Sequence, residues 1–432
     1  MSLSAPIKVQ ALQWKLSEKA KREPTYRFYV LYDKIWREDV LTHAYLVAKA
    51  NQGAPGVDGQ SFAGIELLGR EAWLADLRQA IRTGTYRPQA VRRVLIPKAG
   101  GGERPLGIPT IRDRVVQTAM KLILEPIFEV DLEPNAYGYR PGRSARDAIQ
   151  QVHRAMCRGR TDVVDADLSK YFDTIPHGDL LKSVARRIAD GRVLHLLKMW
   201  LQVPVEEKDK DGTRRWSGGK QHQRGTPQGG VISPLLANLY LNRFLKHFRQ
   251  CGKQQQWQAQ IVAYADDFVI LSRGHATEAK EWAQAVLSRI GLVLNEQKTS
   301  VRNSRVESFD FLGYSFGLRY WKGGVSYLTA WPSKKSLGRL REKVSELLEP
   351  WQLLPWEEVR DQLNRLLRGW SQYFNYGSLA KAYGLVNHHV EERVRHFLRR
   401  RHKVRQGAIR RWPKEEIFGP LGVTLLQRPP LA

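Results

Sequence analysis

The sequence predicts a mixed α+β fold up to about residue 330, followed by an all-helical region. Before residue 330, short apolar runs bounded by glycine-rich turns alternate with amphipathic stretches, as in strands and helices packed together. After residue 333 the apolar residues recur with helical spacing. The 432 residues, of which 42% are apolar, suffice for more than one domain and exclude global disorder.

In the first part of the chain, turn signals separate helical from alternating patterns. Residues 51–59 combine Gly, Pro, Asn and Asp and predict a turn. Ser144 followed by Asp147 is typical of a helix N-terminus with an acid at its third position. The predicted elements are a helix over 29–49, strands over 91–97 and 104–109 around a turn at 99–102, and helices over 112–128 and 145–156.

The rest of the chain continues this alternation and then becomes helical. The stripe of Val, Leu, Trp and Phe within 355–376 recurs with a helical period. The predicted elements are a strand over 162–168, a helix over 178–201, a polar hairpin within 203–222, a helix over 233–248, strands over 261–264 and 268–271, a helix over 277–290, strands over 309–316 and 325–328, and helices over 334–348 and 385–401 on either side of the 355–376 helix.

Charge and cysteine content restrict the class of protein. Lys and Arg number 70 against 43 Asp and Glu, a formal charge of +27 that indicates a polyanion partner, most often nucleic acid, although a merely soluble basic enzyme is the alternative. The two cysteines exclude a disulfide scaffold and a four-cysteine zinc site. No secretory signal and no apolar run of about 20 residues is found, so we expect a cytoplasmic protein without a membrane segment.

Adjacent carboxylates lie between two predicted strands. Asp266 and Asp267 separate the apolar runs 261–264 and 268–271. Two like charges in one turn repel each other unless a cation joins them, and Mg²⁺ prefers carboxylate and phosphate oxygens. An ordinary acidic hairpin turn would contain the same residues, so this segment alone leaves the metal site open.

A third carboxylate, Asp167, ends another short strand. Together with Asp266 and Asp267 it would complete a two-metal site for phosphoryl transfer. Its neighbours Asp165 and Asp173 are as well explained as residues that cap or solvate a turn. The glycine-rich segment 225–238 begins a helix, where backbone can approach a base pair or a phosphate closely.

The order of motifs along the chain resembles that of a reverse transcriptase. Ala265 and the C-terminal motif 368–374 (RGWSQYF) are similar to bacterial group II intron reverse transcriptase/maturases. The resemblance covers roughly residues 50–430. The motifs that carry it are 93–98 (RVLIPK), 104–109 (RPLGIP), 138–144 (GYRPGRS), 167–173, 225–238, 264–267 (YADD), 295–299 (NEQKT) and 311–314 (FLGY).

The resemblance implies a right-hand polymerase, with fingers and a palm built on an RRM-like antiparallel sheet and an all-α thumb/maturase domain after it. It divides the chain into an N-terminal extension (1–60), fingers with part of the palm (61–160), the palm with the catalytic hairpin (161–330) and the helical thumb/maturase RNA-binding domain (331–432).

The resemblance also assigns residues. Asp167, Asp266 and Asp267 would be catalytic and would bind two Mg²⁺ ions, for which Mn²⁺ can substitute. The nucleotide-binding residues would be Lys98, Arg104, Phe172, Gln228, Gly229 and Lys298, and the primer grip would be Phe311, Leu312, Gly313 and Tyr314. Phe172 would exclude a ribose 2′-OH, with a place in the core as its alternative. Lys298 would donate a proton to pyrophosphate, unless it is simply a solvated lysine.

The C-terminal region is expected to bind RNA. Residues 393–414 hold ten Lys/Arg and no acid, which favours salt-dependent phosphate contacts. Phe397 and Trp412 could stack on unpaired bases, although we expect Phe397 to pack in the core. The expected RNA-binding residues are Arg399, Arg400, Arg401, Lys403 and Arg405.

The function implied by the resemblance is an RNA-directed DNA polymerase that copies RNA with dNTPs, with DNA as an alternative template, and that binds intron RNA to assist splicing and retrohoming. Its partners would be the RNA template, a DNA primer or target, and dNTPs. The alternatives are a domesticated enzyme in DNA repair, defence or CRISPR adaptation, a splicing cofactor with a vestigial site, and an RNA-dependent RNA polymerase. Many such proteins carry an endonuclease domain with paired cysteines, which the sequence lacks, so the priming mode stays open, as does the oligomeric state.

Overall fold

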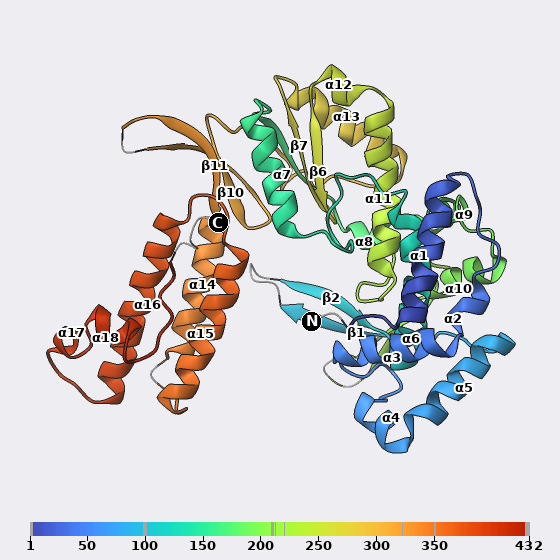
Figure 1. Ribbon diagram of the computed structural model, residues 1–432, viewed down its shortest axis with the longest axis horizontal. Coiled ribbons are helices and arrows are strands. Elements are labelled where there is room, and N and C mark those ends of the chain that lie inside the picture. The colour runs from blue at the N-terminus through green and yellow to red at the C-terminus, as the bar shows by residue number, and fades with distance from the viewer. Residues whose placement is uncertain are drawn as a thin grey trace.

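The computed structural model describes residues 3–97, 102–208, 211, 213–219, 221–321, 323–349 and 351–427. In these segments three sheets and many helices form two bodies: a large α+β part, and a helical part joined to it through one of the sheets (Figure 1). The α+β fold followed by helices that the sequence predicts is therefore confirmed. None of the described helices is both long and apolar enough to span a membrane.

Four antiparallel strands form the central sheet, in the order β6-β7-β3-β8. They are β3 (Asp162–Asp167), β6 (Gln260–Tyr264), β7 (Asp267–Ser272) and β8 (Ser300–Asn303). Both faces of this sheet are covered because apolar residues point to both sides. Val163 and Val269 pack against α7 (Ala145–Cys157), whereas Val164 and Ile270 belong to the core of α11 (Ser233–Gln250) and α13 (Ala276–Arg289). Ser144 and Asp147 form the expected capping box of α7.

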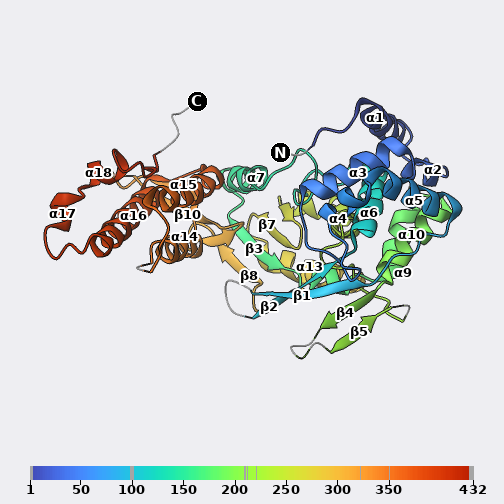
Figure 2. The same ribbon diagram turned by 90° about the horizontal axis from the view of Figure 1, so that it is seen from below.

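A second sheet, which we call the outer sheet, lies beside the central one in the order β2-β1-β4-β5 (Figure 2). It consists of β1 (Val91–Pro97), β2 (Glu103–Ile108), β4 (Pro204–Lys208) and β5 (Arg214–Gly218). Both predicted strand pairings are confirmed, β1 with β2 and β4 with β5, while residues 99–101 of the turn predicted at 99–102 lie outside the described residues. The parallel pairing of β1 with β4, which joins them into one sheet, was not predicted, because nothing local links segments so far apart in the chain.

Further helices surround these two sheets, and all of them except α12 contribute buried residues to one core around α6, which is buried along most of its length. They are α1 (Ile7–Arg22), α2 (Tyr32–Ile35), α3 (Glu38–Ala50), α4 (Phe62–Leu68), α5 (Arg70–Thr83), α6 (Ile111–Glu129), α8 (Tyr171–Thr174), α9 (His177–Ala185), α10 (Gly191–Leu201) and α12 (Lys253–Gln256). Among these helices the sequence analysis missed α1, α4 and α5, and the single turns α8 and α12. The predicted helix over 29–49 is wrong at its start, because Arg37 is extended and separates α2 from α3.

The predicted helix over 178–201 is two helices, and Asp190 separates them. One oxygen of Asp190 accepts hydrogen bonds from the backbone N–H groups of Arg192 and Val193, which caps α10. The other accepts from the N–H groups of Leu31 and Tyr32, at 2.8 Å each. One carboxylate thus begins α10 and holds α2, a tertiary contact that overrides the helical spacing.

A third sheet bridges the two bodies in the order β11-β10-β9. It consists of β9 (Phe309–Phe311), β10 (Tyr314–Tyr320) and β11 (Ser326–Pro332). The single strand predicted over 309–316 is therefore wrong: Leu312 and Gly313 adopt left-handed backbone, with φ of 50° and 78°, and reverse the chain.

The helical part has a core of its own. Its helices are α14 (Lys334–Leu347), α15 (Trp356–Tyr373), α16 (Ala380–Arg401), α17 (Ala408–Arg411) and α18 (Lys414–Phe418). The predicted stripe on α15 is confirmed, since Val359, Leu363 and Leu367 are buried against α14 and α16.

Candidate active site

The three aspartates predicted to be catalytic meet at one end of the central sheet. Asp167 ends β3, Asp267 begins β7, and the two residues are direct partners across this pair of antiparallel strands. Side chains of directly opposed residues lie on the same face of a sheet. Asp266 precedes Asp267 in the turn, and its carbonyl accepts from the N–H of Leu168 at 3.1 Å. The structure thus joins two segments about a hundred residues apart into one acidic site.

The turn between β6 and β7, which we call the aspartate hairpin (residues 260–272), is held from one side by residues 135–138. Ala265 at the turn has a φ of 58°. The N–H of Ala263 donates to Asn135 at 2.9 Å, and the N–H of Tyr137 donates back to Ala263 at 2.8 Å. A Cβ on Gly138 would lie 2.5 Å from the backbone nitrogen of Ala265. Only glycine lets this segment approach the hairpin so closely.

Burial and mutual repulsion destabilise the charged forms of the hairpin carboxylates. Burial raises the pKa of Asp267 to about 8, with further contributions from Asp165, Asp167 and Asp266. Burial also raises the pKa of Asp266, and the charge of Asp167 adds to this shift, while Arg104 and Lys298 oppose it. A site with this much unbalanced negative charge favours a cation.

Lys298 supplies part of that positive charge. Its Nζ donates to Oδ2 of Asp167 at 2.6 Å, and this hydrogen bond raises the pKa of Lys298. Within the described segments, no three His, Cys, Asp or Glu side chains converge closely enough to form a metal cluster by themselves. The oxygen donors nevertheless fit a hard divalent cation, because the strand ends present carboxylate oxygens, and burial, reinforced by the neighbouring carboxylates, raises the pKa values of Asp266 and Asp267.

A loop at residues 225–230 joins the site to the outer sheet. The N–H of Gly107 on β2 donates to the carbonyl of Gln228 at 2.6 Å. Gly229 has a φ of 105°, and a Cβ there would lie 2.1 Å from the carbonyl oxygen of Gly107. On the other side, the N–H of Thr226 donates to the carbonyl of Phe172 at 2.6 Å. The predicted nucleotide-binding residues Gln228 and Gly229 therefore lie between β2 and α8.

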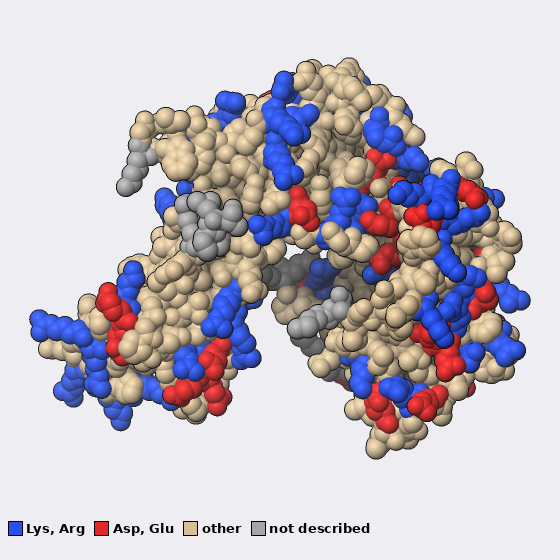
Figure 3. All heavy atoms as spheres, in the orientation of Figure 1, with Lys and Arg blue, Asp and Glu red and all other residues tan. Residues whose placement is uncertain are grey.

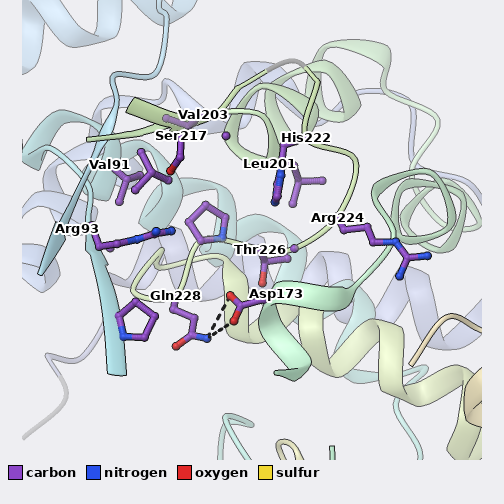
Figure 4. Close-up of a pocket in the computed structure, with 16 residues that line it drawn as sticks. Val91, Arg93, Asp173, Leu201, Val203, Ser217, His222, Arg224, Thr226 and Gln228 are labelled. Carbon is purple, nitrogen blue, oxygen red and sulfur yellow. Dashed lines mark hydrogen bonds between the residues drawn. The ribbon is translucent and has the colours of Figure 1, made fainter. Parts of the chain in front are cut away.

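Side chains continue this connection. Arg104 Nε donates to Gln228 Oε1 at 3.3 Å, and Gln228 Nε2 donates to both oxygens of Asp173. Figure 4 shows Gln228 and Asp173 facing each other at the edge of a cavity of about 340 Å³, which extends under β1, β4 and β5. Lys98, the other predicted triphosphate ligand, lies outside the described residues.

Phe172 lies at the floor of the site and is 8% exposed. Its ring contacts the rings of Tyr139 and Tyr171 edge to face, at 6.4 Å and 5.7 Å between centroids. Tyr139 is 48% exposed, so Phe172 lies just beneath the surface of the site and also belongs to the core. Both roles expected from the sequence are compatible with this position.

The predicted primer grip forms the turn between β9 and β10. Phe311 and Tyr314 are buried, so their side chains are not available to a ligand. Leu312 and Gly313 are partly exposed at the head of a groove of about 910 Å³ between α14 and α15. Tyr373 donates from its hydroxyl to the carbonyl of Leu312 at 2.8 Å, which fixes the turn to α15.

The five cations expected to bind RNA are all exposed at the end of α16 and in the segment after it. Figure 3 shows Lys and Arg side chains gathered over this outer end of the helical part. Arg399 donates to the carbonyls of Val404 and Arg405, and Arg401 donates to the carbonyl of Leu354. These two arginines therefore cap the chain's own backbone.

The aromatic residues near these cations are not available for stacking on bases. Phe397 is buried, as expected, and Trp412 is only 6% exposed, so the stacking role considered for Trp412 is wrong.

Sequence reasoning missed two contributors to the site. Gly138 was noted only as part of a motif, and Asp173 was explained as a residue that caps or solvates a turn. The only signal for Gly138 in the sequence was its place at the start of the motif 138–144, directly before Tyr139. No local signal indicates that Asp173 contacts a residue on another loop.

Comparison with known protein families gives two matches. The family "Reverse transcriptase (RNA-dependent DNA polymerase)" matches residues 96–316, and "Group II intron, maturase-specific domain" matches residues 337–418. The first match contains the aspartate hairpin, Asp167 and the loop at 225–230, and the second contains most of the helical part.

Three curated proteins illustrate the similarity. Protein YkfC of Escherichia coli is 36% identical over 71% of this chain and 87% of its own length. The group II intron-encoded protein LtrA of Lactococcus lactis is 28% identical over 72% of this chain and 60% of its length. An uncharacterized 91 kDa protein in the cob intron of Schizosaccharomyces pombe is 25% identical over 84% of this chain. That match spans 53% of the yeast protein, so the chain corresponds to only part of the last two relatives.

Proposed function

The chain belongs to the reverse transcriptase family, with the maturase-specific domain of group II intron proteins, and we propose that it copies RNA into DNA from dNTPs by a two-Mg²⁺ mechanism and binds intron RNA to assist splicing. The observation that carries the polymerase half is the meeting of Asp167, Asp266 and Asp267 at paired strand ends. The domain division at residues 60, 160 and 330 is part of the same proposal.

The chemistry divides between the aspartates and the cations around them. Bound Mg²⁺ ions would activate the primer 3′-OH and neutralise the charge that develops on the leaving pyrophosphate. Asp167 and Asp267, on the same face of the sheet, and Asp266 in the turn would hold the ions. Lys298, now paired with Asp167, and Arg104 supply fixed positive charge where the triphosphate would lie.

The backbone of the loop at 225–230 would contact the base pair between the incoming nucleotide and the template. Gly229 packs on Gly107 without room for a side chain, and this close packing gives the loop a fixed position beneath the outer sheet. A rigid surface of this kind discriminates a correct pair by shape.

Phe172 is expected to select deoxyribose. Replacing it by valine, Phe172→Val, opens space next to the sugar, and we expect rNTP incorporation relative to dNTP to rise at least about tenfold, since a hydroxyl excluded by shape costs roughly 1–3 kcal/mol. Single-nucleotide extension with paired dNTP and rNTP titrations measures the ratio. An unchanged ratio in an active, folded variant would return Phe172 to a purely structural role.

The exposed cations after α16 are expected to bind RNA phosphates. Within the described residues the side chains of Arg400, Lys403 and Arg405 donate no intramolecular hydrogen bond and are exposed, so they are free to contact phosphates. Replacing all three by glutamine should reduce the slope of log affinity against log salt by about 2, at about 0.7 per lost contact on single-stranded RNA. Binding titrations at several salt concentrations measure this slope; an unchanged slope contradicts the RNA-binding assignment.

Two assays test the proposed function as a whole. Extension of a DNA primer on an RNA template should require dNTPs and should fail with rNTPs alone. Splicing of RNA transcribed from the gene's own locus should be promoted by the protein at near-physiological Mg²⁺. Efficient extension without splicing would replace the maturase half by the second candidate, a domesticated polymerase with a host role; splicing without extension would support a cofactor with a vestigial polymerase site.

A further inference from the structure

Asp173 is an acidic residue beside the site to which the proposed chemistry gives no role. It lies in the single turn of α8, and its side chain is exposed. Gln228 Nε2 donates to Asp173 at 3.3 Å from Oδ1 and 3.2 Å from Oδ2 (Figure 4). The other end of the same amide, Oε1, accepts from Arg104 Nε at 3.3 Å. Three side chains from β2, the loop at 225–230 and α8 thus form one chain of hydrogen bonds.

We propose that Asp173 is a positioning residue that sets the orientation of the Gln228 amide and, through it, the place of Arg104 at the incoming nucleotide. This inference rests on the proposed polymerase function. It assigns to Asp173 control over how tightly a dNTP binds, without direct contact with the substrate.

The direction of the hydrogen bonds gives Asp173 this control. A carboxylate only accepts and a guanidinium only donates, whereas an amide does both at opposite ends. Because Asp173 accepts hydrogen bonds from the amide nitrogen of Gln228, the amide oxygen must point toward Arg104. If the amide turned over, its nitrogen would face the guanidinium, donor against donor, and Arg104 would lose its partner.

The backbone around this chain is held independently of the side chains. The N–H of Gly225 donates to the carbonyl of Ile175 at 2.8 Å, and the N–H of Thr226 donates to Phe172 at 2.6 Å, on either side of Asp173. A Cβ on Gly225 would meet the carbonyl oxygen of Asp173 at 3.0 Å. Changing the Asp173 side chain should therefore change the orientation of the amide and leave the loop in place.

The substitution Asp173→Asn separates orientation from packing. Asparagine has nearly the same shape, but its own amide can donate to Gln228 Oε1 and so reverse the Gln228 amide. We expect the KM for dNTP to rise about tenfold, the size of one lost hydrogen bond to a charged group, with kcat changed less than about twofold and primer–template affinity unchanged. Asp173→Glu keeps a carboxylate and should remain closer to wild type.

Asp179→Asn is the matched control. Asp179 lies on α9, the next helix, and pairs with Lys182 at 3.3 Å, whereas among the described residues the amide nitrogen of Gln228 donates to Asp173, so the KM of Asp179→Asn should equal that of wild type. Steady-state single-nucleotide extension with full-length protein supplies kcat and KM. If the Asp173→Asn variant is active and its KM for dNTP equals that of wild type, the inference is overturned while the proposed function stays intact.

A double-mutant cycle tests whether Asp173 acts through Gln228. Gln228→Met removes both ends of the amide, so adding Asp173→Asn to it should change the KM by less than about twofold. Multiplicative effects of the two substitutions would show that Asp173 acts by another route and would overturn the inference, as would a joint fall in kcat and template affinity. If wild-type protein fails to extend any primer, the proposed function itself fails.

Discussion

Replacing Asp266 by alanine is expected to lower the rate of cDNA synthesis at least about 10³-fold, because the side chain would hold a reacting metal ion. Binding of RNA should be nearly unchanged, since the exposed cations after α16 lie in another part of the molecule (Figure 3). The carbonyl that accepts from Leu168 remains, so the hairpin should keep its shape. Single-turnover extension and RNA titrations on the same preparation measure both quantities.

The thermal midpoint of Asp266→Ala should be equal to or higher than that of wild type, because burial, reinforced by the charge of Asp167, raises the pKa of Asp266 and so destabilises its ionised form. Asp179→Ala, at a partly exposed acid on α9, is the control and should extend primers at the wild-type rate. Near-normal extension by Asp266→Ala would remove the basis of the catalytic assignment.

Replacing Gly138 by alanine is expected to reduce kcat at least about 100-fold, although Gly138 carries no functional group. The new Cβ would lie 2.5 Å from the nitrogen of Ala265 and 3.0 Å from the carbonyl carbon of Tyr264. Both are backbone atoms of the aspartate hairpin, so the hairpin and residues 135–138 must shift apart. A displacement of about 1 Å at a reacting site costs about 100-fold in rate.

Gly178→Ala controls for the loss of a glycine, because a Cβ there meets no atom within 4 Å. This variant should extend primers within about twofold of wild type. If Gly138→Ala extends primers as fast as Gly178→Ala, residues 135–138 do not hold the aspartate hairpin in its active position. Circular dichroism and RNA binding distinguish a displaced hairpin from an unfolded protein.

Three of the four strands of the central sheet, β3, β6 and β7, could be predicted because their apolar runs are short, β-branched and bounded by turn signals, whereas β8 was missed. β3, β6 and β7 begin and end within a residue of the predicted positions. The predicted helix over 178–201 was wrong because a distant partner decided the structure there. Asp190 ends a helical pattern because it also bonds to Leu31 and Tyr32, and no periodicity along residues 178–201 contains that information.

In the site, too, residues within local motifs could be predicted, whereas contacts between distant segments could not. The three aspartates could be identified because each follows or precedes a strand within a distinctive motif. The salt bridge between Lys298 and Asp167 and the contact between Asp173 and Gln228 depend on the approach of segments separated by long stretches of chain. Motif order can suggest that Lys298 belongs to the site, but not which oxygen it contacts. Gly138 and Gly229 matter because of the backbone they face, which only the structure shows.

The metal dependence of primer extension tests the central proposal most directly. Wild-type protein, a DNA primer annealed to RNA and all four dNTPs would be followed in single-turnover time courses with Mg²⁺, after chelation by EDTA, and after Mg²⁺ is restored. If the three aspartates form a two-metal site, cDNA should accumulate with Mg²⁺, stop on chelation and resume on restoration, while RNA remains bound throughout. Extension that continues in excess EDTA, or no extension with any divalent ion while RNA is bound, would contradict the proposal.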